Sequence, residues 1–275
     1  MQTDQPDHAQ WANLDKTENP SAFVKFLDDS RAALMPFVEG QPELYYAWLK
    51  PTDGLQVLDV GSGTGVLLHP LARLLAPTGK VVGIDYSNTM VAAAQARTLG
   101  KNLPLEFLQM DAAEMTFSDN SFDRAMSNIV FQHLPNPVRA LEEMIRVTKP
   151  GGIISLNEQD WETFIVDSSD HLLTRRLLNY FSDFVKNGWI GRQLFGMFVR
   201  AGLKDIVVTP QTVRFDLLPF EVFEGCLAAP MQAAAKEGGF HRADIEAWME
   251  EQRDKHAAGT FFATFTTFQA VGVKP

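Results

Sequence analysis

A carboxylate followed by alternating glycines is the feature of this chain best suited to bind a small ligand. Asp59 ends a short apolar run, and Gly61, Gly63 and Gly65 follow at every second position. Glycine adopts positive φ and has no Cβ, so a ligand can approach the backbone of such a loop closely. The dinucleotide fingerprint of dehydrogenases places its third glycine one position later and needs no preceding carboxylate. Both departures favour a ligand that lacks a pyrophosphate and carries an ammonium group.

Two more carboxylates end the next two strand-like runs. Asp85 can accept hydrogen bonds from both hydroxyls of a ribose, and Asp111 can accept one from the exocyclic amine of adenine. The carboxyl ends of parallel strands line the crevice in which open α/β sheets bind nucleotide-like ligands. The three acids therefore predict one site at this edge of a sheet.

Alternating strand and helix patterns supply that sheet. Strands are expected at 55–60, 80–85, 105–110, 122–127 and 152–157, with helices at 66–76, 89–99 and 138–148. Strands that alternate with helices indicate βαβ units, right-handed crossovers and a parallel, doubly wound α/β sheet.

The flanking segments are less regular. Residues 1–16 are expected to be disordered, a helix to begin near 19–21 and end at Pro36 or Gly40, and a short aromatic helix to span 43–49. Beyond 158 we expect two helices in 168–201, a strand at 203–208, helices in 219–257 and a closing strand at 261–273. The predicted organisation is a helical cap at 1–50 and one domain at 51–275. Helical insertions at about 160–201 and 216–258 would cover the mouth of the sheet.

Composition excludes several classes of partner. The 275 residues carry a net charge of −10 and no basic run, which argues against nucleic acid. The single cysteine, Cys226, excludes an internal disulfide and is interpreted as a core or pocket-wall residue. The polar start is not a signal peptide, and the uncharged run at 259–273 is too short for a membrane span. We therefore expect a cytoplasmic protein, and no residue constellation indicates a metal.

Together these motifs resemble those of class I S-adenosylmethionine-dependent methyltransferases, in particular the methyltransferases of ubiquinone and menaquinone biosynthesis. The glycine loop, the two following acids, the stretch 128–135 and the segment Arg146-Val147-Thr148-Lys149-Pro150-Gly151-Gly152 carry the resemblance, which is firm over roughly 50–160. It implies a Rossmann-like, mostly parallel seven-stranded sheet with an antiparallel last strand. It also implies S-adenosyl-L-methionine as the cofactor.

The resemblance implies a set of cofactor-binding residues. They are Asp59, Gly61, Ser62, Gly63, Gly65, Asp85, Tyr86, Met90, Asp111, Ala112 and Asn128. The family often has Cys at the position of Ser62, a tolerated difference because the backbone does the binding there. An acidic pocket suits the ammonium and sulfonium groups, and a helix starting near Thr64 would offer N–H groups to the carboxylate. The structural alternatives are a turn cap for Asp59, a helix start for Asp85, a turn for Asp111 and helix core for Met90.

Candidates for catalysis are fewer. His133 follows the fourth strand, and because histidine is the side-chain type that ordinarily titrates near neutrality, it could remove a proton from the acceptor; its alternative is a structural role at a helix start. Glu158 and Asp160, followed by Trp161, come after the fifth strand and are candidate bases or acceptor-binding groups, or else solvated loop. Arg192 could grip an anionic acceptor or serve as an ion-pair partner.

The predicted reaction is in-line transfer of the sulfonium methyl to O, N or C of a small acceptor. The predicted lid segments are rich in Phe, Leu and Met, which suggests an aromatic or moderately apolar acceptor. The alternatives are a cofactor-binding regulatory or assembly subunit without turnover and, less favoured by the loop spacing, a nicotinamide-dependent oxidoreductase. The sequence leaves a homodimer open.

Overall fold

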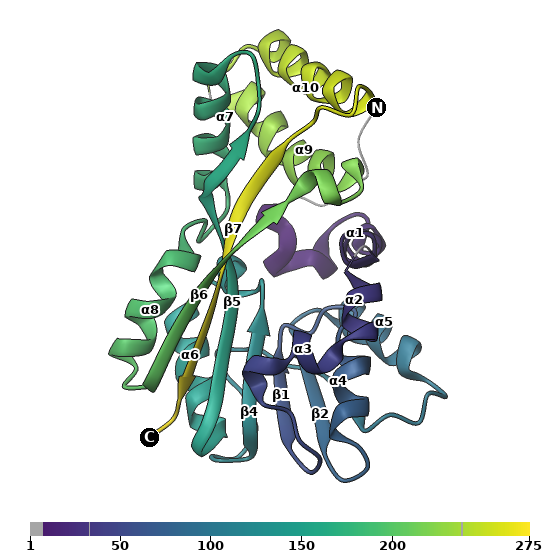
Figure 1. Ribbon diagram of the computed structural model, residues 1–275, viewed down its shortest axis with the longest axis vertical. Coiled ribbons are helices and arrows are strands. Elements are labelled where there is room, and N and C mark those ends of the chain that lie inside the picture. The colour runs from purple at the N-terminus through teal and green to yellow at the C-terminus, as the bar shows by residue number, and fades with distance from the viewer. Residues whose placement is uncertain (1–7, 33, 238) are drawn as a thin grey trace.

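The strands form one seven-stranded sheet. The computed structural model describes residues 8–32, 34–237 and 239–275. The strand order is β3-β2-β1-β4-β5-β7-β6 (Figure 1). The strands are β1 Gln56–Val60, β2 Lys80–Asp85, β3 Leu105–Gln109, β4 Phe122–Asn128, β5 Thr148–Val166, β6 Lys204–Arg214 and β7 Ala263–Val273. β1 to β5 pair in parallel, and β7 runs antiparallel to both β5 and β6, which confirms the predicted fold class.

Helices cover both faces because successive side chains of a strand point to opposite sides. On one face, Leu58 and Val60 of β1 share a core with α6 (Pro137–Val147) and α8 (Ile190–Arg200). On the other, Val57 packs with α4 (Leu68–Leu75) and α5 (Asn88–Thr98). α8 is therefore a layer of the sheet domain, although it lies inside the segment expected to form a lid.

β5 and β6 are longer than the sequence predicted. β5 continues to Val166, so Glu158, Asp160 and Trp161 lie within a strand and not in the loop after it. β7 pairs with β5 from Ile153 through Asp160 and again at Ile165 and Val166. Pairing with a partner strand stabilises this polar stretch, whose residue types are depleted in strands.

The remaining long helices form a helical extension beyond the far ends of β5 and β7 (Figure 1). It consists of α7 (His171–Phe184), α9 (Phe220–Glu237) and α10 (Arg242–Ala257). Aromatic side chains interlock in its core, with Trp161 and Phe181 ring centroids 4.8 Å apart, and Cys226 is buried among them. Most aromatic residues expected to line an acceptor site are thus packed in this second core. No described helix combines the length and the apolar character needed to cross a bilayer.

The N-terminal segment is ordered over its described part. It comprises a 3₁₀ helix, η1 (His8–Lys16), then α1 (Pro20–Ala32), α2 (Met35–Gly40), α3 (Pro42–Tyr45) and a 3₁₀ turn, η2 (Ala47–Leu49). The expected disorder is wrong for residues 8–16, because Leu14 is buried with Phe23 and Met90; residues 1–7 lie outside the described part. Pro36 sits in the first turn of α2, where its missing N–H is not needed, so it starts a helix where an end was expected.

Candidate cofactor site

The glycine loop after β1 is a tight turn that only glycine can form at three positions. Gly61, Gly63 and Gly65 have φ of +76°, +54° and +70°. A Cβ on Gly61 would lie 2.3 Å from Val130 Cγ2, and one on Gly65 would lie 2.3 Å from Phe107 Cζ. Side chains of Val130 and Phe107 therefore occupy the space that a Cβ would need at Gly61 and Gly65, while close approach of a ligand to this backbone stays a prediction.

Asp85 organises this loop from the tip of β2. Its Oδ2 accepts the Gly63 N–H (2.9 Å) and its Oδ1 accepts the Ser87 N–H (2.9 Å). Burial raises the pKa of Asp85, and these two N–H bonds oppose the rise. Tyr86 beside it is 59% exposed. Asp85 therefore fixes the loop as well as ending the strand.

Asp59 faces a pocket of about 420 Å³, which Gly61, Ser62, Gly65 and Asn128 also line. The structure thus brings five of the predicted cofactor residues onto one cavity. Burial, and then the charge of Asp85, raise the pKa of Asp59 to about 7, against the opposing effect of a nearby arginine. The carboxyl can therefore change ionisation state when a cation arrives.

The other predicted residues are not among those that line this pocket. Met90 and Ala112 are buried, at 2% and 8% exposure. Asp111 Oδ1 accepts the Ala113 N–H at 2.8 Å, as a residue that forms a turn does, and its contact with adenine stays a prediction. Met90 packs on Leu14, which places the N-terminal segment over this side of the site.

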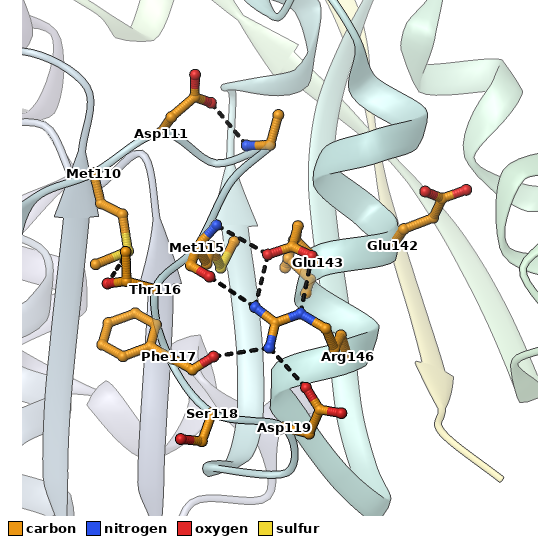
Figure 2. Close-up of polar contacts among 12 residues, drawn as sticks. Met110, Asp111, Met115, Thr116, Phe117, Ser118, Asp119, Glu142, Glu143 and Arg146 are labelled. Carbon is orange, nitrogen blue, oxygen red and sulfur yellow. Dashed lines mark hydrogen bonds and ion pairs between the residues drawn. The ribbon is translucent and has the colours of Figure 1, made fainter.

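Arg146 fixes the loop that carries Asp111 (Figure 2). Its guanidinium donates to the carbonyl oxygens of Met115 and Phe117, each at 2.8 Å, and pairs with Asp119 and Glu143. Glu143 in turn accepts the Met115 N–H at 2.9 Å. The first residue of the Arg146–Gly152 motif thus positions the loop after β3, a role that the sequence did not reveal.

Two of the three candidate catalytic groups, Glu158 and Asp160, are buried and bind other protein groups outside the pocket. Glu158 is 0% exposed, and it accepts the N–H groups of Val130 (2.8 Å), Phe131 (2.7 Å) and Gln132 (3.3 Å). Burial raises its pKa to about 7, although the three N–H bonds lower it. Its carboxylate therefore holds the turn after β4 and does not face the pocket, which corrects its expected role as a base.

Asp160 is also 0% exposed, and both of its oxygens accept from the Arg192 guanidinium. This pair realises the ion-pair alternative for Arg192 and removes Asp160 from the candidate bases. His133 lies in a 3₁₀ turn, η3 (Phe131–His133), partly exposed, with its ring 5.7 Å from that of Trp11. It too lies outside the lining of the pocket.

Apart from Asn128, sequence reasoning missed the carboxamides that line the pocket. Four carboxamides from four neighbouring strands line it: Asn128 of β4, Asn157 of β5, Gln269 of β7 and Gln211 of β6. Asn157 Nδ2 donates to Asn128 Oδ1 at 2.8 Å. Carboxamides are uncommon inside strands, so this was the available signal.

The opposite wall comes from the N-terminal segment. Arg31 of α1 and the aromatic residues Phe37, Tyr45, Tyr46 and Trp48 line it. Tyr46 donates its hydroxyl to the Leu67 carbonyl oxygen, which ties this wall to the end of the glycine loop. These residues precede the first strand, where no motif pointed to them.

Comparisons with known proteins agree with this geometry. A family model described as a methyltransferase domain matches residues 51–184. A 37.1 kDa protein of a Streptomyces fradiae transposon, described as uncharacterized, is 35% identical over 221 residues, 79% of this chain and 62% of that protein. The chain therefore spans less than two thirds of this relative. The demethylmenaquinone methyltransferase of Bacillus cereus is 29% identical over 189 residues, 60% of this chain and 80% of that enzyme.

A solved structure shares the fold. Phosphoethanolamine N-methyltransferase 2 of Haemonchus contortus, in complex with S-adenosyl-L-methionine, has a TM-score of 0.56 and 18% identity, covering 92% of this chain and 60% of that chain. The chain thus contains a segment that matches a methyltransferase domain, and it shares its fold with a methyltransferase that binds S-adenosyl-L-methionine, so it is similar to the S-adenosylmethionine-dependent methyltransferases.

Proposed function

We propose that this chain transfers the methyl group of S-adenosylmethionine to a small-molecule acceptor. The observation that carries the proposal is the convergence of Asp59 and the glycine loop on one pocket, with Asp85 holding the loop from β2. The donor supplies a methyl group on a sulfonium, which is already an activated leaving group. The chain's own residues bind the donor, align the acceptor and exclude water, and positioning can supply about 7–11 kcal/mol in ideal cases.

The pocket walls support an acceptor that is aromatic or moderately apolar and also carries hydrogen-bonding groups. Phe37, Tyr45 and Trp48 contribute aromatic side chains to the lining, and the carboxamides of Asn157 and Gln211 contribute hydrogen-bond donors and acceptors. The case for an aromatic acceptor therefore rests on these lining residues, because most of the aromatic residues of the helical extension are packed in its core. The Bacillus cereus relative is named as a demethylmenaquinone methyltransferase, which supports a small-molecule acceptor.

His133 is our candidate base for acceptors that must lose a proton. Glu158 and Asp160 are fully buried, whereas His133 is partly exposed in the turn after β4, outside the residues that line the pocket. A positioned base adds roughly 10²–10⁴-fold in rate. We also propose that the chain is cytoplasmic and forms a homodimer, and sedimentation of the purified chain tests the homodimer.

Turnover decides between the proposal and its alternatives. The purified chain is incubated with methyl-labelled S-adenosylmethionine and a panel of phenols, quinols and amines, and mass spectrometry detects methylated products. Donor binding with no product from any acceptor class would favour the regulatory or assembly subunit. Binding of a nicotinamide dinucleotide in place of the methyl donor would favour the oxidoreductase.

Replacing Asp85 tests the cofactor assignment directly. Asp85→Ala removes the partner of the Gly63 N–H and the expected ribose contact, and an unpaired buried polar group costs about 1–3 kcal/mol. We expect S-adenosylhomocysteine affinity to fall about 10- to 100-fold by calorimetry. Asp29→Ala, on the exposed side of α1, is the control. Unchanged affinity in Asp85→Ala would contradict the assignment.

A further inference from the structure

Two opposite charges line the same pocket without pairing with each other. The Arg31 guanidinium and the Asp59 carboxyl both face the cavity. Among the described residues, no carboxylate oxygen lies within 4.0 Å of Arg31, and its Nη1 makes only long contacts of 3.4 Å, to the Leu27 carbonyl oxygen and Ser30 Oγ. Burying an unpaired charge is costly. Each of these two groups is thus available to a ligand charge of the opposite sign.

Helix α1 aims Arg31 at the cofactor loop. Phe23, Leu27 and Arg31 recur at i, i+4 and i+8, so they share one face of the helix. Phe23 packs with Met90, and Leu27 Cδ1 lies 3.1 Å from where a Cβ on Gly63 would be. This face therefore follows the glycine loop from the side of Met90 to the side of Asp59.

From the sequence, a helix starting near Thr64 is expected to bind the carboxylate of the cofactor through its free N–H groups. The structure begins α4 at Leu68, after a turn closed by the Leu68 N–H and the Gly65 carbonyl oxygen. Arg31 is the one Lys or Arg among the described residues that line the pocket. A guanidinium is also the side chain best suited to hold a carboxylate through two parallel hydrogen bonds.

The electrostatics of Arg31 fit this role. Burial lowers the pKa of Arg31, and the nearby Tyr45, Asp59 and Asp28 oppose that effect. Asp28 already pairs with Arg97 of α5, which also fixes α1 against the sheet domain. The positive charge of Arg31 is therefore left for the pocket.

We propose that Arg31 binds the α-carboxylate of the methyl donor while Asp59 receives its α-ammonium group, so that the two residues together recognise the amino-acid end of the cofactor. The inference rests on the proposed function, because it deepens the same site. It assigns to α1, a helix outside the matched domain, the selection of a zwitterionic ligand.

Calorimetry with two ligands tests the proposal. S-adenosylhomocysteine carries the amino-acid end, whereas 5′-methylthioadenosine shares its nucleoside and thioether and lacks that end. We expect Arg31→Gln to weaken S-adenosylhomocysteine about 10- to 100-fold and to leave 5′-methylthioadenosine within about twofold. Arg31→Lys, which keeps the charge, should recover part of the loss. Arg242→Gln, on the exposed side of α10, is the control.

The outcomes separate this inference from the proposed function. Equal loss for both ligands would mean a structural role for Arg31 and overturn the inference, and thermal unfolding shows whether the variant is folded. Unchanged S-adenosylhomocysteine affinity in Arg31→Gln would also overturn the inference. If free amino acids also bound to the wild-type complex with S-adenosylhomocysteine, Arg31 would be assigned to the acceptor. Failure of the wild-type chain to bind S-adenosylhomocysteine at all would instead refute the proposed function.

Discussion

Asp59 is a carboxyl poised to titrate at neutral pH. Its pKa of about 7 in the free protein means that half of the molecules carry it protonated there, because burial and Asp85 disfavour its charge. A cation bound beside it stabilises the ionised form, so binding releases a proton below and around that pH. We expect donor affinity to rise from pH 6 toward pH 8, approaching about tenfold per unit at the acid end.

Calorimetry in buffers of different ionisation enthalpy measures that proton. Near pH 7 the wild-type chain should release a fraction of a proton on binding S-adenosylhomocysteine, because Asp59 titrates in this range. Asp59→Asn keeps the shape of the side chain and cannot titrate, so it should remove the buffer dependence. A wild-type affinity that is flat over this range would show that Asp59 does not meet the ligand cation.

For Glu158 we predict an effect on the stability of the fold and not on turnover. Its folded pKa of about 7 lies above the ordinary value of 4.5, so the fold favours the protonated form. The stabilisation is therefore fully present below pH 4.5 and is lost as pH rises through about 7. We expect Glu158→Gln to flatten the dependence of the unfolding free energy on pH, measured by urea unfolding at pH 5 and pH 8.

Glu158→Ala separates the hydrogen bonds from the charge. It leaves the N–H groups of Val130, Phe131 and Gln132 without their acceptor, and each unpaired buried group costs about 1–3 kcal/mol. We expect a loss of at least about 3 kcal/mol at either pH. A loss confined to methyl transfer, with unfolding unchanged, would restore Glu158 to the catalytic residues.

At the scale of elements, η1 fastens the N-terminal segment to α5. Asp15 accepts from Ser87 Oγ (2.6 Å) and from the N–H groups of Asn88 (2.7 Å) and Thr89 (3.2 Å), at the first turn of that helix. We expect Asp15→Ala to lower the unfolding free energy by about 1 kcal/mol, as loss of an N-cap does. Since η1 also packs over Met90, stopped-flow should show faster cofactor dissociation. Equal dissociation rates in Asp15→Ala and wild type would mean that this segment does not retain the cofactor.

Local patterns predicted the elements that carry the glycine loop, and non-local pairing decided the rest. The loop was predictable because positive φ demands glycine at Gly61, Gly63 and Gly65 whatever surrounds them. The continuation of β5 was not, since Asn157 and Glu158 owe their strand conformation to the pairing with Gln269 and Phe268 of β7. Arg31 was missed for a similar reason. It lies about 30 residues before the glycine loop, and it lines the pocket only because α1 packs beside that loop.

At the scale of the whole molecule, two cores meet along β5 and β7. One lies between the sheet and helices α6 and α8, and the other joins α7, α9 and α10 around Trp161. α1 contacts both α5 and α9, so the N-terminal segment spans the two bodies beside the pocket (Figure 1). The N-terminal segment therefore links the pocket to both cores, which a domain match ending at residue 184 does not reveal.

The net charge of −10 gives the molecule a last testable property. S-adenosylmethionine carries one net positive charge, whereas S-adenosylhomocysteine carries none, so only the donor is attracted by the field of an acidic protein. We expect the association rate of the donor to fall several-fold between roughly 0.01 M and 0.3 M salt, as the Debye length shrinks from about 30 Å to below 10 Å. Trp48, which lines the pocket, supplies the fluorescence signal for stopped-flow. Equal salt dependence for the two ligands would mean that the acidic surface does not steer the donor, because their shapes differ by a single methyl group and their charges by one unit.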